Sequence, residues 1–247
     1  MAEVARAQEG DAWTRAGIVP GAVVADVGCG PAAVTVAMAD VVGEDGRVIG
    51  VEREPDTLAV AQRVVANAGA RNVELRQGQA TATGLEPGSL DVAVMRHVLA
   101  HNGGQEQAIV DHLASLVRPG GSVYVIDVDL TAIRILDADP DLDDLIDKYV
   151  EFHRRRGNDP WIGLRLGKLA TAAGLTSVEH RGWYAIVQFV PGMRPPAWAA
   201  RDAMMTDGII DEDDAARWDA AFARTDAATV PPTLLAPLFS VVGRRPA

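Results

Sequence analysis

Short apolar runs alternate with amphipathic segments along the first half of this sequence, and this alternation limits the folds open to the chain. The first of these runs, 23–27, is rich in β-branched residues and stops at glycines, as a buried strand does. Strands are expected over about 23–27, 47–51, 73–76, 90–95 and 122–127. Between them, helical spacing of apolar residues predicts helices over about 34–41, 58–68 and 104–117. The alternation predicts an α/β fold with a Rossmann-like, doubly wound, mostly parallel sheet and helices on both faces.

The sequence after Asp129 no longer follows this alternation, and we expect it to add a helical cap. Helices are expected over 137–156, 161–173 and from the Asp211–Asp214 capping box to about Arg224, with strands over about 176–190 and 234–242. We expect a single domain over 1–247. Its ligand-binding core covers about 13–130, and its inserted cap covers about 131–175 and 191–225.

The acidic run that begins at Asp137 resembles a calcium-binding loop only in part. Leu142 stands where such a loop needs glycine, and Lys148 stands where it needs a bidentate glutamate. The run is therefore expected to be the acidic start of a helix and not a calcium site.

Composition excludes several classes of protein. The chain has 247 residues and a net charge of -11, so a nucleic-acid partner is not expected. Its single cysteine, Cys29, excludes an internal disulfide and a metal site built on paired cysteines. No apolar stretch reaches the roughly 18 residues of a membrane span, and charged residues interrupt the first 13 positions. We expect a cytoplasmic protein, away from the membrane.

A glycine-rich loop between the first strand and the first helix is the first candidate binding element. Gly28 and Gly30 allow a sharp turn and a close approach of a ligand to the backbone, and the following helix offers free N–H groups. With Ala33 they also satisfy the loose dinucleotide pattern G-x-G-x-x-A. The loop alone therefore leaves a nicotinamide dinucleotide open.

Three neighbouring residues favour a nucleoside that carries positive charge. Asp26 would repel a pyrophosphate beside the loop, and Glu52, at the end of the second strand, would accept both ribose hydroxyls. Pro31 is expected at the first helical position, where it removes a donor that a pyrophosphate would use. An NAD(P)-dependent oxidoreductase stays an alternative, but a catalytic Tyr-x-x-x-Lys motif is not found.

Four motifs in order give the sequence a family resemblance. They are Val24–Pro31 (VADVGCGP), Val48–Arg53 (VIGVER), Asp91–Leu99 (DVAVMRHVL) and Leu116–Gly121 (LVRPGG). The chain resembles class I S-adenosylmethionine-dependent methyltransferases over about residues 13–130. Within them it is most similar to the small-molecule group of ubiquinone/menaquinone and bacterial natural-product methyltransferases. The resemblance implies S-adenosylmethionine as cofactor.

The resemblance also implies roles for individual residues. The methionine part of the cofactor would lie at the glycine loop, the ribose at Glu52, and the adenine between Arg53 and Gln79-Ala80. Gln79 stands where the family commonly has aspartate, but its amide oxygen still accepts a hydrogen bond. The cofactor-binding residues implied are Asp26, Gly28, Gly30, Glu52, Arg53, Gln79, Ala80, Arg96 and His97.

Histidines are the candidates for proton transfer. A protonated acceptor such as a phenol needs a general base, and His101 or His97, after the fourth strand, is placed for it. Their spacing imitates a zinc-binding helix, but Val98 replaces the glutamate, so no metal is expected. His101 is equally well explained as a capping or core residue. His153 is the third candidate, with a solvated cation at a helix end as its alternative.

We therefore expect methyl transfer to a small, aromatic or polyketide-like metabolite, most readily at oxygen. Carbon or nitrogen acceptors, and a protein that keeps the fold without methylating, remain alternatives. The chain is expected to act as a monomer or homodimer on a small molecule. Aromatic residues of the second half are expected to line the acceptor site or to pack in the core: Trp161, Trp183, Tyr184 and Trp198.

Overall fold

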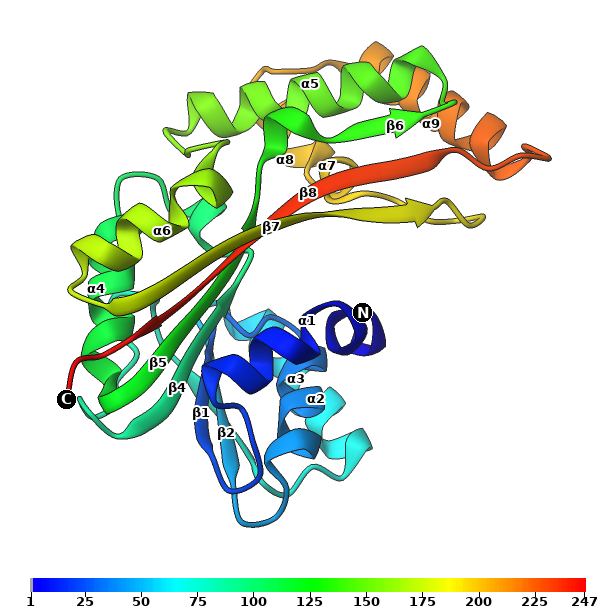
Figure 1. The fold of residues 1–247 in the computed structure, drawn as a ribbon. Coiled ribbons are helices and arrows are strands. Elements are labelled where there is room, and N and C mark those ends of the chain that lie inside the picture. Colours follow the sequence, from blue (N-terminus) through cyan, green and yellow to red (C-terminus); the bar gives the residue numbers. More distant parts are fainter. Residues whose placement is uncertain (1) are drawn as a thin grey trace. The chain divides into compact units, whose positions relative to one another are not determined.

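The computed structural model describes residues 2–247, with side chains from residue 5 onward. The chain forms two compact units (Figure 1). The first contains residues up to Asp127, together with Arg165–Arg181 and Ser240–Ala247. The second contains Val128–Leu164 and Gly182–Phe239. Strands β7 (Thr176–Gln188) and β8 (Thr233–Arg244) contribute residues to both units.

A mostly parallel sheet forms the centre of the first unit. Its strands lie in the order β3-β2-β1-β4-β5-β8, and β7 pairs with β8. The bounds are β1 Val23–Val27, β2 Arg47–Glu52, β3 Val73–Gln77, β4 Leu90–Arg96 and β5 Val117–Val128. The pairs β1–β2, β1–β4, β2–β3 and β4–β5 are parallel. This arrangement confirms the predicted fold class.

The parallel register aligns the ends of the strands. Val27 pairs with Val51 on one side and with Met95 on the other, and Glu52 pairs with Gln77. The chain therefore leaves β1, β2, β3 and β4 at one edge of the sheet, where the loops that follow them meet.

Helices cover both faces of this sheet. Helices α1 (Ala2–Ala16), α2 (Ala33–Val42) and α3 (Pro55–Ala68) lie on one face, and α4 (Glu106–Leu116) lies on the other (Figure 1). Strands β1, β2 and β4 are almost entirely buried and rich in Val, Ile, Ala and Met, as their apolar runs predicted. Strand β3, at the edge of the sheet, is exposed or half-buried. Helix α6 (Ile162–Ala172) also lies mostly in this unit.

The second unit packs helices on an antiparallel pair of strands. Strand β6 (Arg134–Leu136) pairs with the first half of β8. The helices are α5 (Pro140–Arg155), α7 (Pro196–Ala199), α8 (Arg201–Thr206) and α9 (Glu212–Asp226). Leu142 and Leu145 of α5, with Trp218 and Phe222 of α9, are at the centre of its core and are fully buried. The predicted capping box of Asp211 and Asp214 begins α9.

Some elements differ from the sequence expectations. Strand β5 begins at Val117 and not at Ser122, because the Pro119-Gly120-Gly121 segment forms an irregularity within the β4–β5 ladder and does not end the strand. Helix α1, strand β6 and the short helices α7 and α8 were not predicted, since none of them contains a long apolar run. Helix α5 begins at Pro140 with Asp139 as its N-cap, three residues later than expected.

We expect Trp218→Ala to destabilise the protein by about 3–5 kcal/mol, the usual cost of truncating a fully buried aromatic side chain. Trp218 has no exposed surface in the core of the second unit. Urea denaturation followed by circular dichroism measures the effect. Trp161→Ala is the matched control, because Trp161 is 39% exposed, and it should cost much less. Equal losses for the two variants would contradict the assigned core.

Candidate functional site

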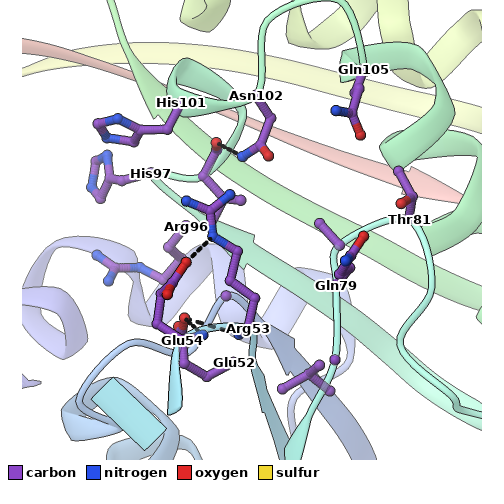
Figure 2. Close-up of a pocket in the computed structure, with 15 residues that line it drawn as sticks. Glu52, Arg53, Glu54, Gln79, Thr81, Arg96, His97, His101, Asn102 and Gln105 are labelled. Atoms are coloured by element: carbon purple, nitrogen blue, oxygen red, sulfur yellow. Dashed lines mark hydrogen bonds and ion pairs between the residues drawn. The ribbon is translucent and has the colours of Figure 1, made fainter. Parts of the chain in front are cut away.

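A cavity of about 420 Å³ opens at the carboxyl ends of β1, β2, β3 and β4, and all of its lining residues belong to the first unit (Figure 2). Most residues expected in the site from the sequence line it. They are Gly28, Glu52, Arg53, Gln79, Ala80, Arg96, His97 and His101. Thr81, Asn102 and Gln105 also line the cavity and were not predicted. Asp26, Gly30 and His153 are not among the lining residues.

The glycine loop is anchored to the neighbouring strand by its backbone. The N–H groups of Gly28 and Cys29 donate to the carbonyl oxygen of Val51, at 2.8 and 3.1 Å. Gly28 has a φ of +78°, and a Cβ atom there would lie 2.4 Å from Cγ2 of Val98. Only glycine meets both conditions without strain.

The expected position of Pro31 at the start of the helix is wrong. Helix α2 begins at Ala33, and Ala32 is its N-cap in the left-handed region with a φ of +63°. The loop makes one more turn before the helix starts, so Pro31 lies ahead of the helix and removes none of its donors. Only the carboxylates of Asp26 and Glu52 therefore disfavour a pyrophosphate beside this loop.

The carboxylate of Glu52 holds the loops on either side of it. It accepts hydrogen bonds from the backbone N–H groups of Gly30 at 3.0 Å, Arg53 at 2.9 Å and Glu54 at 3.0 Å. Figure 2 shows it among the lining side chains. These bonds orient the carboxylate at the end of β2. Oε1 accepts two of them, so the site that can still accept from a ligand is on Oε2.

Asp26 lies beneath the loop and does not line the cavity. Its carboxylate is buried and accepts a hydrogen bond from Oγ1 of Thr35 on α2, at 2.6 Å. Burial raises the pKa of Asp26, while the bond from Thr35 opposes the rise. Asp26 thus connects the end of β1 to α2 and places an acid near the cavity. Burial, together with Asp26 and Glu52, also raises the pKa of the Cys29 thiol, which fits a packing residue.

The wall formed by β2 and the segment after β3 carries both charged and amide side chains. Arg53 pairs with Glu54 at 3.0 Å, and both are largely exposed. Gln79 and Ala82 exchange backbone hydrogen bonds that close a tight turn at Gln79-Ala80. This wall offers donors and acceptors suited to a polar heterocycle.

The segment after β4 presents the two histidines. His97 has a φ of +56°, which is unusual for a residue with a side chain, and its N–H donates to the carbonyl of Ile126. A 3₁₀ turn, Leu99–His101, follows and is held by Oδ2 of Asp127, which accepts from the N–H of Ala100 at 3.2 Å. The backbone strain at His97 is thus supported by bonds to β5.

The two imidazole rings lie close together on one side of the cavity (Figure 2). Both pKa values are lowered, chiefly because the surrounding protein disfavours the charged ring. Arg96 and His101 add to this effect at His97, and Arg53 adds to it at His101. Both rings are accessible from solvent. Neutral imidazoles can therefore accept a proton from a group in the cavity at neutral pH.

His153 lies in the second unit and is fully buried on α5. Its ring packs against Tyr149, with centroids 4.5 Å apart, and its Nδ1 lies 3.2 Å from Nδ2 of Asn158. The solvated cation considered as its alternative is wrong, because the ring faces the core. Tyr149 and His153 do share a face of α5, as the helical spacing predicted.

The aromatic residues of the second half divide between core and surface. Trp198 packs on Phe222 with centroids 5.2 Å apart, and the guanidinium of Arg201 lies over the Trp198 ring, 4.4 Å from its centroid. Trp161 and Tyr184 are exposed, and Arg154 lies 5.1 Å over the Trp161 ring. Trp183 is half-buried.

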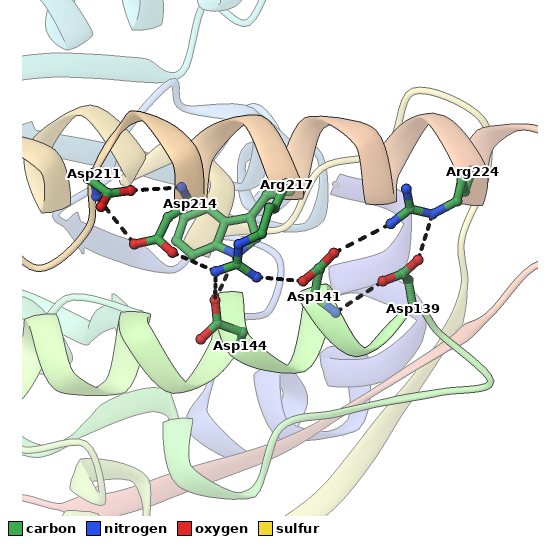
Figure 3. Close-up of polar contacts among 8 residues, drawn as sticks. Asp139, Asp141, Asp144, Asp211, Asp214, Arg217 and Arg224 are labelled. Atoms are coloured by element: carbon green, nitrogen blue, oxygen red, sulfur yellow. Dashed lines mark hydrogen bonds and ion pairs between the residues drawn. The ribbon is translucent and has the colours of Figure 1, made fainter.

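The acidic run of α5 forms ion pairs with α9 (Figure 3). Arg217 contacts Asp141, Asp144 and Asp214, and Arg224 contacts Asp139 and Asp141. Trp218 Nε1 also donates to Asp144 at 3.1 Å. These acids pair with arginines, so the run is the acidic side of a helix contact.

Glu9 is a residue near the site that sequence reasoning missed. It is 2% exposed on α1, and it accepts from Nε and Nη2 of Arg96 at 3.1 and 2.5 Å. The signal was present, because the buried residues Ala5, Ala12, Trp13 and Ala16 recur at helical spacing and Glu9 falls on the same face. An acid on that face indicates a buried partner.

No group of three or more His, Cys, Asp or Glu side chains among residues 2–247 is placed to hold a metal ion. Within the same residues, no helix is both long enough and apolar enough to cross a membrane.

Comparison with known proteins gives the family. A family model described as a methyltransferase domain matches residues 18–155. The chain belongs to this methyltransferase family. Membership confirms the predicted class of enzyme, the class I S-adenosylmethionine-dependent methyltransferases of the small-molecule group, and their cofactor.

Two curated relatives each match a little less than half of this chain. An arsenite methyltransferase of Halobacterium salinarum is 34% identical over 117 residues, which cover 47% of this chain and 30% of that protein. A demethylmenaquinone methyltransferase of Bacillus mycoides is 32% identical over 110 residues, which cover 44% of this chain and 46% of that protein. The chain thus spans less than half the length of these curated relatives.

A solved structure extends the fold similarity to nearly the whole chain. Phosphoethanolamine N-methyltransferase 2 of Haemonchus contortus, in complex with phosphomonomethylethanolamine and S-adenosylhomocysteine, has a TM-score of 0.61 at 16% identity. The match covers 98% of this chain and 53% of that one. At this identity the comparison supports the fold alone.

We expect Gly28→Val to abolish binding of S-adenosylhomocysteine, because the new side chain would collide with Val98 and the residue would keep an unfavourable positive φ. Calorimetric titration measures binding, and circular dichroism checks the fold. Gly84→Val is the matched control. Gly84 has a similar φ of +72° with nothing within 4 Å of its Cβ position. Its replacement by valine therefore has the free-energy cost of a positive φ but causes no collision. A folded Gly28→Val protein that binds normally would contradict the loop assignment.

Proposed function

We propose that the cavity binds S-adenosylmethionine and that the protein transfers its methyl group to an oxygen atom of a small molecule. The observation that carries this proposal is the arrangement at the ends of four parallel strands. One cavity there contains an oriented acid, Glu52, and two neighbouring histidines, His97 and His101, whose pKa values are lowered.

The order of the strands supports one orientation of the cofactor along the cavity. Neighbouring strands are about 4.8 Å apart, and the order β3-β2-β1-β4 puts Gln79 and Glu52 at one end of the cavity and Arg96 at the other. We place the adenine at Gln79-Ala80 and Arg53, the ribose at Glu52, and the methionine part between Gly28 and Arg96. Asp26 supports this site from beneath the loop, and Gly30, within the loop, supports it through its hydrogen bond to Glu52.

The histidines favour an oxygen acceptor. Methyl transfer from a sulfonium is an in-line displacement, so the protein mainly positions the reactants and excludes water. A phenol or alcohol must also lose a proton, and a neutral imidazole is suited to remove it near neutral pH. We assign this role to His101 or His97. His153 is the weaker candidate, since the core of the second unit surrounds it.

The chemistry of the chain supports an organic acceptor over arsenite, the substrate named for one relative. Arsenic(III) is a soft ion that thiolates would bind, whereas this chain has one cysteine, and burial raises the pKa of its thiol. The relative named for demethylmenaquinone is consistent with an aromatic acceptor. We propose a small aromatic or polyketide-like metabolite. The cytoplasmic location, the monomer or homodimer, and the absence of a nucleic-acid partner stay predictions.

Incubation with trideuteromethyl-labelled S-adenosylmethionine and a panel of phenols, alcohols, amines and 1,3-dicarbonyl compounds tests the proposal. Mass spectrometry identifies the labelled product and its acceptor atom. We expect label on a phenolic oxygen. Label only on nitrogen or carbon would overturn the choice of acceptor. Binding of S-adenosylhomocysteine without turnover of any acceptor would favour a non-methylating protein.

We expect Glu52→Ala to weaken binding of S-adenosylmethionine by about 1.5–3 kcal/mol, the usual contribution of hydrogen bonds to a charged group. Calorimetric titration at pH 7 is the measurement. Glu54→Ala is the control, because Glu54 also lines the cavity but its side chain is 59% exposed and pairs with Arg53. An unchanged dissociation constant for Glu52→Ala would remove this residue from the site.

Replacing the base should slow single-turnover methylation of a phenolic acceptor by about 10²- to 10⁴-fold, with little change in cofactor affinity. His97→Ala and His101→Ala are compared with His112→Ala, whose ring contacts Thr83 outside the cavity. Because the pKa values of His97 and His101 are lowered, the active neutral form persists below pH 6.5. The wild-type rate should fall only at more acidic pH. Wild-type rates in both cavity variants would exclude histidine as the base.

A further inference from the structure

The buried carboxylate of Glu9 connects helix α1 to the wall of the cavity. Carboxylates are almost never fully buried unless they are paired, and Glu9 is 2% exposed. Four donors surround it. Arg96 supplies Nε and Nη2 at 3.1 and 2.5 Å, Tyr124 its hydroxyl at 2.9 Å, and Trp13 its indole N–H at 3.4 Å.

This pairing fixes the orientation of the Arg96 guanidinium. A carboxylate that accepts from both Nε and Nη2 binds one edge of the planar guanidinium and so prevents the guanidinium from rotating. The remaining nitrogen, Nη1, makes no hydrogen bond with the part of the chain that the structure describes. Arg96 lines the cavity, and 19% of its side chain is exposed.

The strand order places this guanidinium away from the nucleoside end of the cavity. Arg96 ends β4, and β1 with its glycine loop separates β4 from β2, where Glu52 lies. With the adenosine at β2 and β3, as in the function proposed above, the amino-acid part of the cofactor extends toward β4. The carboxylate of that part is an anion that needs a partner when it leaves water.

We propose that Glu9 is a positioning residue for the cofactor. It holds Arg96 so that Nη1 binds the carboxylate of the amino-acid part of S-adenosylmethionine. Helix α1 then contributes to the binding site through Glu9, although Glu9 itself does not contact the cofactor. Without Glu9, the guanidinium is drawn toward Asp26, the other acid that interacts with it, and loses this alignment. The inference rests on the proposed occupancy of the cavity.

The test compares two probes that differ in the amino-acid part. S-adenosylhomocysteine has the carboxylate, whereas 5′-deoxy-5′-methylthioadenosine keeps the adenosine and the thioether but has no amino acid. We expect Glu9→Gln to weaken S-adenosylhomocysteine binding about 10-fold and methylthioadenosine binding less than 2-fold, as measured by calorimetric titration. A purely structural role would weaken both equally, and that result would overturn the inference.

Matched variants separate positioning from packing. Asp11→Asn changes an exposed acid two residues further along the same helix and should leave both affinities unchanged. Arg96→Lys keeps a cation beside Glu9, so the pair and the fold are retained, but it removes Nη1. We expect the same selective loss for S-adenosylhomocysteine. If Arg96→Lys binds both probes as wild type does, the inference is wrong.

A different result, obtained with the wild-type protein, would contradict the proposed function. Wild-type protein that binds neither probe would refute cofactor binding in this cavity. Wild-type protein that binds both probes with equal affinity would leave the nucleoside site standing and would overturn only the role of Glu9 and Arg96.

Discussion

Parallel pairing of β1 with both β2 and β4 is the constraint on which the site depends. Val27 pairs with Val51 on one side and with Met95 on the other, so three loops start from the same edge of the sheet. Backbone hydrogen bonds then link these loops to neighbouring strands: Gly28 to the end of β2, and His97 to β5. The acid, the glycine loop and the histidines are thus positioned by the sheet itself.

Charge is balanced locally at two places in the protein, although its net charge is -11. Glu9 neutralises Arg96 at the cavity wall, and the acids of α5 pair with Arg217 and Arg224 of α9. The two cases differ in burial. The Glu9–Arg96 pair is shielded from solvent and fixes the orientation of the Arg96 side chain. The α5–α9 ion pairs are more exposed, so they are weaker and are screened by salt.

The sequence predicted the parts of the fold that depend on local pattern. Four apolar runs became β1, β2, β4 and the second half of β5, because strands buried on both faces need continuous apolar residues. The less apolar stretch 73–76 became the edge strand β3, and the ordered motifs indicated the family. Features that depend on tertiary contacts were not predictable in this way. The extra turn that places Pro31 before α2, the burial of His153, and the partner of Glu9 each depend on residues distant in the sequence. The Glu9–Arg96 contact joins residues 87 positions apart.

The burial of Cys29 makes the chain a natural reporter of its own loop. The thiol is partly covered, and its raised pKa keeps it in the unreactive protonated form. A Cβ atom on Gly50 would lie only 3.0 Å from its sulfur, so the thiol packs closely against β2. Since the sequence has no other cysteine, alkylation of the protein by a thiol reagent reports on this loop alone. Its rate should rise under conditions that loosen the packing of the loop against β2.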